Sequence, residues 1–179
     1  DSIKSKFIII LKDKIKKITT GPNSNDHIGA ITVKSSKEKI LSQINDVKNN
    51  AQIFEGSISD NTGWFIPPTL IIDPPEKAKI MQEETFGPVI TLNGFNDLNK
   101  LIKTLNENNN YGLSASIFTK NKYIARKISK MLVTGTVNIN DVLSHYGISD
   151  LPFGGVGNSG YGRVHGKEGL RSLVELKAY

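Results

Sequence analysis

Residues 88–140 read PVITLNGFNDLNKLIKTLNENNNYGLSASIFTKNKYIARKISKMLVTGTVNIN, and this stretch decides the fold. Three segments in it have the composition of strands, at 88–95, 113–119 and 135–140. Two amphipathic helical patterns separate these segments, and Asp97 stands where it can cap the first helix. Strands that alternate with short helices are typical of a parallel sheet. The sequence therefore predicts an α/β fold, with a mainly parallel sheet and helices on both faces.

The residues before this stretch give two further helical signals. Apolar residues spaced by three and four predict a helix over 3–18. Ser35 and Glu38 form a possible capping box, which predicts a second helix that runs to about Asn49.

Extended segments are expected on either side of the central stretch. Residues 51–56 predict a short strand, and 63–72 (GWFIPPTLII) should be extended because two consecutive prolines exclude a helix and mark an edge or an irregular crossing. The tail, 166–179, offers a last helix and room for a final strand.

Composition excludes several classes of function. The chain has 179 residues, the size of one ordinary domain, and a formal net charge of +6. Its lysines are dispersed rather than gathered with aromatic residues on one face, so no nucleic-acid partner is expected. It has no cysteine, and its three histidines lack metal-ligand spacing, so no disulfide, metal site or thiol nucleophile is expected within it.

The beginning of the chain predicts an incomplete protein. The sequence starts at Asp1 rather than Met and opens directly into a helical pattern, so we expect a fragment or a processed product. No apolar run approaches the roughly 20 residues needed to span a bilayer. The lysine-flanked FIIIL segment (7–11) is too short for a signal peptide, and a cytoplasmic protein is expected.

The glycines of GGVGNSG (154–160) match the G-x-G-x-x-G of dinucleotide-binding turns. That motif needs a strand before it and a helix after it, and no strand pattern leads into these residues. We therefore expect a loop that needs positive φ angles rather than a phosphate site. Ser159 is a poor hydrolase nucleophile, because Tyr161 replaces the second glycine of G-x-S-x-G. His145 and His165, on either side of this loop, are expected in surface or capping roles.

Glu83 and Glu84 precede Phe86 in EETFGPV (83–89). Adjacent carboxylates point in different directions on a regular element, so they form a poor acid–base pair. They could be ordinary helix-end charges. Alternatively, a carboxylate beside a flat apolar ring could hold the hydroxyls and the face of a planar ligand.

Five segments together carry a family resemblance. EETFGPV resembles the E-E-x-F-G-P-V signature of the aldehyde dehydrogenase superfamily. GWFIPPTLI, NYGLSASIFTK, GTVNIN and LPFGGVGNSGYGR are each similar to family segments, in the family's order. The likeness extends from about Phe7 to the end of the chain.

The resemblance implies that residues 1–179 are the C-terminal part of a catalytic domain, beginning just after the catalytic cysteine. It implies a parent protein that oxidises an aldehyde to a carboxylic acid with NAD or NADP and forms a homo-oligomer. Glu84 matches the carboxylate on the nicotinamide ribose and Phe86 the aromatic residue against the nicotinamide. Phe153 matches an aromatic residue of the aldehyde tunnel, and 141–150 the loop that shapes specificity.

The nucleophilic cysteine, the general-base glutamate and the cofactor-binding domain would all precede this chain, so no catalytic residue is expected within it. Isolated, the chain should therefore be inactive. Two alternatives stay open. One is a truncated, inactive homologue that acts as a binding or regulatory partner. The other is an unrelated basic α/β binding module.

Overall fold

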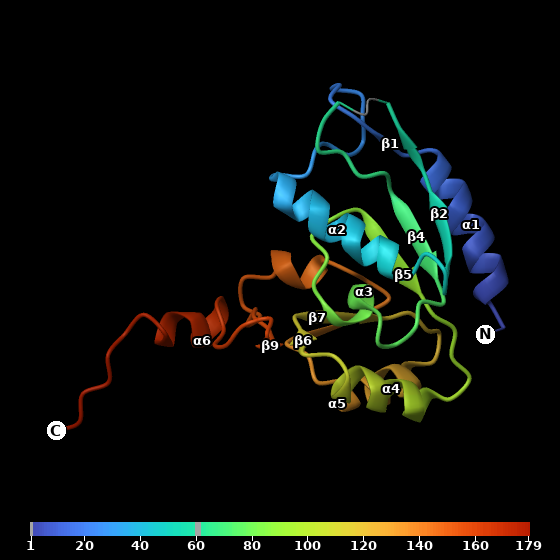
Figure 1. Ribbon diagram of the computed structural model, residues 1–179. Helices are drawn as coiled ribbons and strands as arrows, with labels where there is room; N and C mark the ends of the chain where they lie inside the picture. Colours follow the sequence, from blue (N-terminus) through green and yellow to red (C-terminus); the bar gives the residue numbers. More distant parts are fainter. Residues whose placement is uncertain (1, 60–61) are drawn as a thin grey trace. The chain divides into compact units, whose positions relative to one another are not determined.

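The computed structural model describes residues 2–59 and 62–179, which form two compact units divided between Asn96 and Asp97 (Figure 1). The first unit contains α1 (Lys4–Lys16), β1 (Thr19–Thr20), α2 (Lys34–Asp46), β2 (Gln52–Glu55), β3 (Ser57–Ile58), β4 (Thr69–Ile72), α3 (Lys79–Gln82) and β5 (Val89–Leu92). The second contains α4 (Leu98–Glu107), β6 (Tyr111–Gly112), β7 (Ser114–Ile117), α5 (Lys122–Met131), β8 (Thr136–Ile139), the 3₁₀ helix η1 (Ser144–Gly147), β9 (Val156–Gly157) and α6 (Gly166–Arg171).

The first unit is built on a three-stranded sheet in the order β2-β4-β5. Strand β4 pairs antiparallel with β2 and parallel with β5, with Thr69 opposite Val89. All four residues of β4 are buried. Strand β4 is therefore the centre of this unit.

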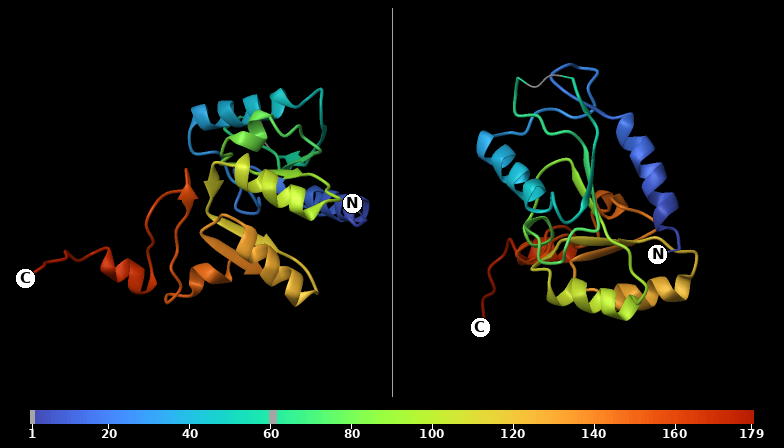
Figure 2. Two further views of the ribbon diagram at one scale, coloured as in Figure 1. Left: turned by 90° about the horizontal axis from the view of Figure 1, so that it is seen from below. Right: turned by 45° about the vertical axis from the view of Figure 1, so that its right-hand side comes forward.

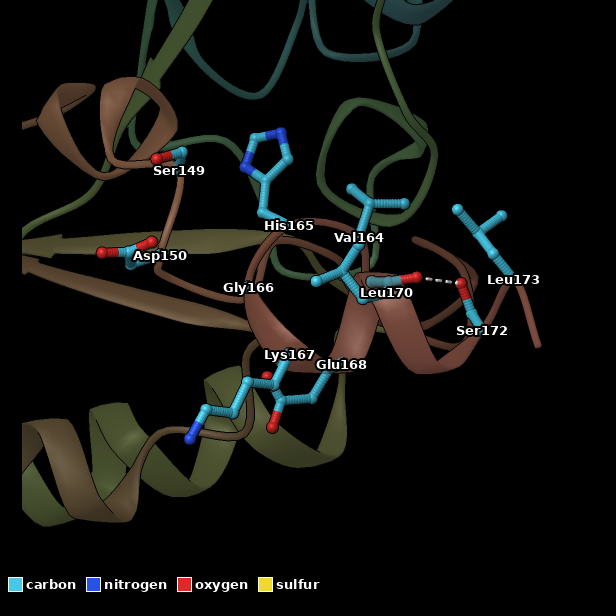
Figure 3. Close-up of a pocket in the computed structure, with 11 residues that line it drawn as sticks. Ser149, Asp150, Val164, His165, Gly166, Lys167, Glu168, Leu170, Ser172 and Leu173 are labelled. Carbon is cyan, nitrogen blue, oxygen red and sulfur yellow. Dashed lines mark hydrogen bonds between the residues drawn. The ribbon is translucent and has the colours of Figure 1, made fainter. Parts of the chain in front are cut away.

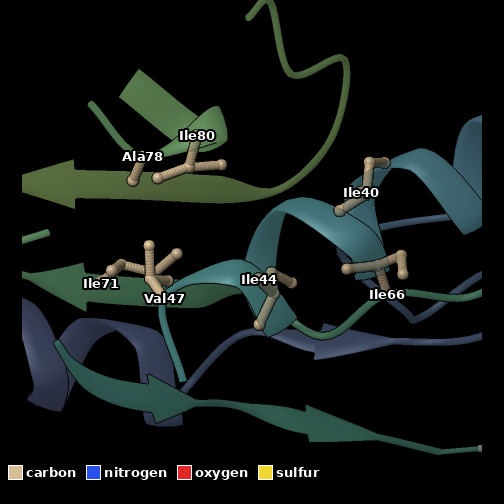
Figure 4. Close-up of a cluster of buried hydrophobic side chains, with 7 residues drawn as sticks. All are labelled: Ile40, Ile44, Val47, Ile66, Ile71, Ala78 and Ile80. Atoms are coloured by element: carbon tan, nitrogen blue, oxygen red, sulfur yellow. The ribbon is translucent and has the colours of Figure 1, made fainter. Parts of the chain in front are cut away.

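A helix packs on each face of this sheet, because successive side chains of a strand point to opposite faces. Leu70 and Ile72 pack with Ile15 of α1. Ile71 belongs to a second cluster, on the side of α2. Figure 4 shows the seven buried members of that cluster: Ile40, Ile44, Val47, Ile66, Ile71, Ala78 and Ile80. Each fully buried side chain of this size contributes about 1.5–3 kcal/mol, so the two clusters hold the unit together.

The predicted capping box at the start of α2 is wrong. The helix begins two residues earlier than the box requires, and its N-cap, Val33, makes no side-chain capping bond. Ser35 therefore lies inside the first turn. Glu38 instead pairs with Lys34, one turn before it, at 3.7 Å.

The second unit contains a β–α–β element in which α5 connects the parallel strands β7 and β8. Asp97 accepts hydrogen bonds from the backbone N–H groups of Asn99 and Lys100, which confirms the predicted cap of α4. The side chain of Asn106 in α4 bonds the backbone at the end of α5, at Met131 and Val133. Two views in Figure 2 show the same elements from other sides.

The α/β class is confirmed, but the described residues do not clearly form the mainly parallel sheet that was expected. The strands form four small sheets, two of which contain antiparallel pairs. Strand β5 pairs with β4, and β7 pairs with β8. Alternation of strands and helices predicts parallel neighbours, but it does not say which strands pair, because pairing is a non-local property.

The last part of the chain contains little regular secondary structure. Helix α6 is confirmed at Gly166–Arg171, whereas 172–179 form no strand. Among the described helices, none has the length and apolar character that a bilayer crossing requires.

Candidate functional site

The segment Glu83–Gly87, called here the 83–87 loop, is held by helix α2. Gln43 is buried, and its amide accepts a 2.8 Å hydrogen bond from the Thr85 hydroxyl and lies 3.4 Å from the Glu83 carboxylate. Lys39 donates a 2.9 Å hydrogen bond to the carbonyl oxygen of Glu84. A side chain at Gly87 would approach Ile40 of the same helix to 2.6 Å. The loop therefore lies close against α2 and is bonded to it.

The two predicted cofactor-contacting side chains are exposed. The Glu84 carboxylate is exposed and makes no hydrogen bond or ion pair with the described part of the chain. The Phe86 ring is 78% exposed, far more than an aromatic residue of a hydrophobic core. Phe86 is therefore not part of a hydrophobic core in the described part of the chain. The main chain of the 83–87 loop is therefore held in place, while the Glu84 carboxylate and the Phe86 ring, two residues apart, are exposed.

This arrangement suits a planar ligand that carries hydroxyl groups. A carboxylate is an acceptor for hydroxyl donors, and an exposed aromatic face packs on a flat ring. A nicotinamide joined to a ribose has both features. The chemistry of the two side chains therefore fits that group.

Phe153 lies in the second unit, within four rings called here the aromatic cluster: His145, Tyr146, Phe153 and His165. His145 is stacked on Phe153 at a centroid distance of 5.9 Å and an interplanar angle of 25°. Tyr146 meets Phe153 edge-on at 5.2 Å, and His165 lies 6.0 Å from both. Three aromatic rings therefore lie next to Phe153.

The side chain of Asn138, in β8, is hydrogen-bonded to the loop 141–150. Its side-chain oxygen lies 3.0 Å from Nδ1 of His145, and its amide nitrogen donates a 3.3 Å bond to the carbonyl of Val142. Both Asn138 and His145 are buried. The expected surface or capping role of His145 is therefore wrong, because the ring packs against Phe153 and the strand beneath it.

Asp141 caps the turn that carries His145. Its carboxylate accepts 2.9 Å hydrogen bonds from the backbone N–H groups of Leu143 and Ser144. These bonds, with that from Ser144 the stronger cause, hold the pKa of the Asp141 carboxyl below its ordinary 3.8.

His165 has an unusual backbone conformation, with φ 64° and ψ 165°. This region is almost restricted to glycine and costs a larger residue on the order of 1–3 kcal/mol. His165 precedes α6, but its side chain makes no capping bond. The neighbouring residue, Val164, exchanges two 2.8 Å backbone bonds with Phe153, which fixes His165 close to that ring.

The glycines at 154–160 form a loop and not a phosphate turn. Gly157 and Gly160 have φ angles of 58° and 121°, as predicted, and no helix begins at Gly157. Gly157 belongs to β9, which pairs antiparallel with β6, and a side chain there would collide with the carbonyl of Asn110. Ser159 accepts a 3.0 Å hydrogen bond from the backbone of Gly112, so its hydroxyl has a structural partner.

The predicted residues divide between the two units. Glu84 and Phe86 are brought together on the 83–87 loop, and Phe153 is placed by the aromatic cluster of the other unit. Within the described ranges, no group of three or more histidine or acidic side chains could hold a metal ion.

Sequence reasoning missed the residues that support these side chains. Gln43 lies on the apolar stripe of its helix, beside Ile40, Ile44 and Val47. A polar residue on such a stripe is a signal for a buried hydrogen bond. Tyr146 and the two histidines had no comparable signal, because only the fold brings them around Phe153.

Comparisons with known proteins identify the family of the chain. The model of the aldehyde dehydrogenase family matches residues 1–179, so the chain belongs to that family. A Staphylococcus haemolyticus protein named as a candidate aldehyde dehydrogenase is 31% identical over 99% of this chain, which spans 38% of that protein's length.

Two solved structures have the same fold. An aldehyde dehydrogenase mutant from Bacillus cereus matches with a TM-score of 0.88 and 28% identity, over 98% of this chain and 36% of the other. The betaine aldehyde dehydrogenase of Staphylococcus aureus in complex with NAD+ matches with a TM-score of 0.85 and 36% identity, over 96% of this chain and 35% of the other.

Proposed function

We propose that this chain is the C-terminal part of the catalytic domain of an NAD- or NADP-dependent aldehyde dehydrogenase, preceded by a separate cofactor-binding domain. The observation that carries the proposal is the 83–87 loop, whose main chain is bonded to α2 while Glu84 and Phe86 remain exposed. The NAD+ in the S. aureus relative supports the same class of cofactor.

Glu84 and Phe86 position the cofactor. The Glu84 carboxylate accepts hydrogen bonds from the ribose hydroxyls, and the Phe86 ring packs on the nicotinamide. When bound, the nicotinamide supplies the acceptor for the hydride that leaves the aldehyde carbon. Because the loop is already fixed, little ordering is needed when the cofactor binds, which favours a reactive geometry.

The second unit receives the substrate. Phe153 and the loop 141–150 line the path of the aldehyde, and the anchored His145 keeps Phe153 in place. The thiolate that attacks the aldehyde comes from outside this chain, which has no cysteine.

Aldehyde-dependent reduction of NAD or NADP tests the proposal. The full-length protein should produce reduced nicotinamide with a panel of aldehydes, and the 179-residue chain alone should not. Turnover by the chain alone, with contaminating enzymes removed, would overturn the proposal that the nucleophile comes from outside this chain. An intact protein that contains only these residues would favour the alternative, an inactive homologue that binds a partner.

A further inference from the structure

His165 is the one member of the aromatic cluster whose ring nitrogens both lack a hydrogen-bond partner in the described part of the chain. Its Nδ1 atom is buried, although the residue as a whole is only half-buried. Buried N–H groups without an acceptor are rare because they lose water and gain nothing. The favoured tautomer therefore carries its proton on Nε2, the ring nitrogen left accessible.

The surroundings of His165 define what this N–H group can meet. The residue borders a hollow of about 890 Å³ whose other walls include the apolar side chains of Val164, Leu170 and Leu173 (Figure 3). This volume is in the range of small-molecule sites. On its other side, the His165 ring lies 6.0 Å from Phe153 and from Tyr146.

The charges around the hollow favour a neutral ligand group. Asp150, Lys167 and Glu168 are among its lining residues, so two acids and one base border it. A carboxylate would meet more like charge than opposite charge, whereas an ether, hydroxyl or carbonyl oxygen would not. An N–H donor in this setting selects a neutral oxygen acceptor.

We propose that His165 is a specificity-determining residue that donates a hydrogen bond from Nε2 to a neutral oxygen at the far end of an aromatic aldehyde. The flat body of the aldehyde packs against Phe153 and Tyr146, and its oxygen substituent faces the hollow. This inference rests on the proposed function. It also gives a role to the strained backbone of His165, since a glycine there would relieve the strain but lose the donor.

The test compares benzaldehyde with 4-methoxybenzaldehyde on the full-length protein. The wild type should prefer the methoxy compound in kcat/KM by about three- to ten-fold, the range for one net hydrogen bond. His165→Phe keeps a flat ring without the donor and should abolish this preference. His165→Gly should abolish it too, with no loss of thermal stability, whereas a merely structural histidine would give a less stable protein.

Two control variants show whether the preference for the methoxy compound depends on His165 or on a tyrosine hydroxyl. Tyr123→Phe removes a hydroxyl from an exposed tyrosine of α5 and should keep the preference. Tyr146→Phe removes the hydroxyl group of the cluster, which could also donate a hydrogen bond. A preference lost in Tyr146→Phe but kept in His165→Phe would overturn the proposal.

A binding measurement distinguishes failure of this inference from failure of the proposed function. Benzyl alcohol and 4-methoxybenzyl alcohol, titrated calorimetrically in the presence of NAD, should show the same preference in the wild type and none in His165→Phe. If neither aldehyde is oxidised, the proposed function fails. The difference in binding between the two alcohols still tests the role of His165 in that case. Equal binding of the two alcohols by the wild type would overturn the inference.

Discussion

The hydroxyl of Thr85 donates a 2.8 Å hydrogen bond to the side-chain oxygen of Gln43, which is buried in α2. This bond joins a core helix to the loop that carries Glu84 and Phe86. The position of the proposed cofactor contacts therefore depends on a residue that touches no ligand.

Replacement of Gln43 should destabilise the protein. Gln43→Leu keeps most of the volume but leaves the Thr85 hydroxyl without its acceptor, at a cost of about 1–3 kcal/mol in the free energy of unfolding. Gln52→Leu is the matched control, because Gln52 is exposed and its side chain makes no hydrogen bond with the described residues, and it should change that free energy by no more than about 0.5 kcal/mol. Urea unfolding curves measure both. Equal midpoints for the two variants would show that the Gln43 bond contributes nothing.

Loss of the Glu84 charge should slow hydride transfer in the full-length protein. Glu84→Gln removes an ionised acceptor worth about 1.5–3 kcal/mol, so the rate should fall by roughly ten- to 150-fold, with a smaller effect on cofactor affinity. Glu83→Gln changes the adjacent carboxylate, which faces Gln43 instead, and should leave the rate within about two-fold. Pre-steady-state kinetics measures both rates, and an unaltered rate in Glu84→Gln would remove Glu84 from the cofactor site.

Replacement of the exposed Phe86 ring should affect hydride transfer more than stability, whereas replacement of a core phenylalanine would mainly affect stability. Phe86→Ala should slow hydride transfer by loosening the nicotinamide end of the cofactor. Because the ring is 78% exposed, its removal should change the free energy of unfolding by less than about 0.5 kcal/mol. A large drop in the melting temperature with an unchanged hydride-transfer rate would assign Phe86 a structural role.

The Asn138 anchor should control the mobility of the loop 141–150. Asn138→Leu removes both hydrogen bonds to the loop and leaves a buried N–H of His145 without its acceptor, at a cost of about 1–3 kcal/mol. Hydrogen exchange should accelerate at 142–147, and KM for the aldehyde should rise more than kcat falls. Unchanged exchange in this segment would show that the loop is held by other contacts.

Acid should loosen the same loop through Asp141. Because folding lowers the pKa of this carboxyl below 3.8, the ionised form stabilises the folded turn. That contribution is present above pH 3.8 and is lost as the pH falls through the lower folded pKa. A carbon-13 NMR titration of the Asp141 carboxyl should show the lowered pKa, and Asp141→Asn should remove the acid-dependent exchange of Leu143 and Ser144. A midpoint at or above 3.8 would contradict this account.

Local signals in the sequence predicted local structure well. Asp97 is an N-cap because its neighbours alone determine the turn, and the strand over 51–56 was equally well marked. The capping box at Ser35 failed because a different residue, Lys34, begins the helix. Boundaries depend on competing single-residue choices and vary by about one or two residues at each end of a helix.

Features that depend on distant residues could not be predicted in the same way. The pairing of β5 with β4, rather than with β7, depends on residues far apart in the sequence. The burial of His145 depends on Asn138, seven residues earlier, and on Phe153 after the loop. The motif EETFGPV marked Glu84 and Phe86, but nothing in it indicated that Gln43 supports them.

The β7–β8 pair has a consequence for the chain when it is produced alone. Within the part that the structure describes, no third strand pairs with either one, so each leaves a row of backbone N–H and C=O groups open at its outer edge. In a two-stranded parallel sheet these edges are different surfaces, and a copy that adds to one of them exposes the other again. Such addition has no closing step, so isolated chains would assemble into open-ended aggregates that grow with concentration, not into a dimer of defined size.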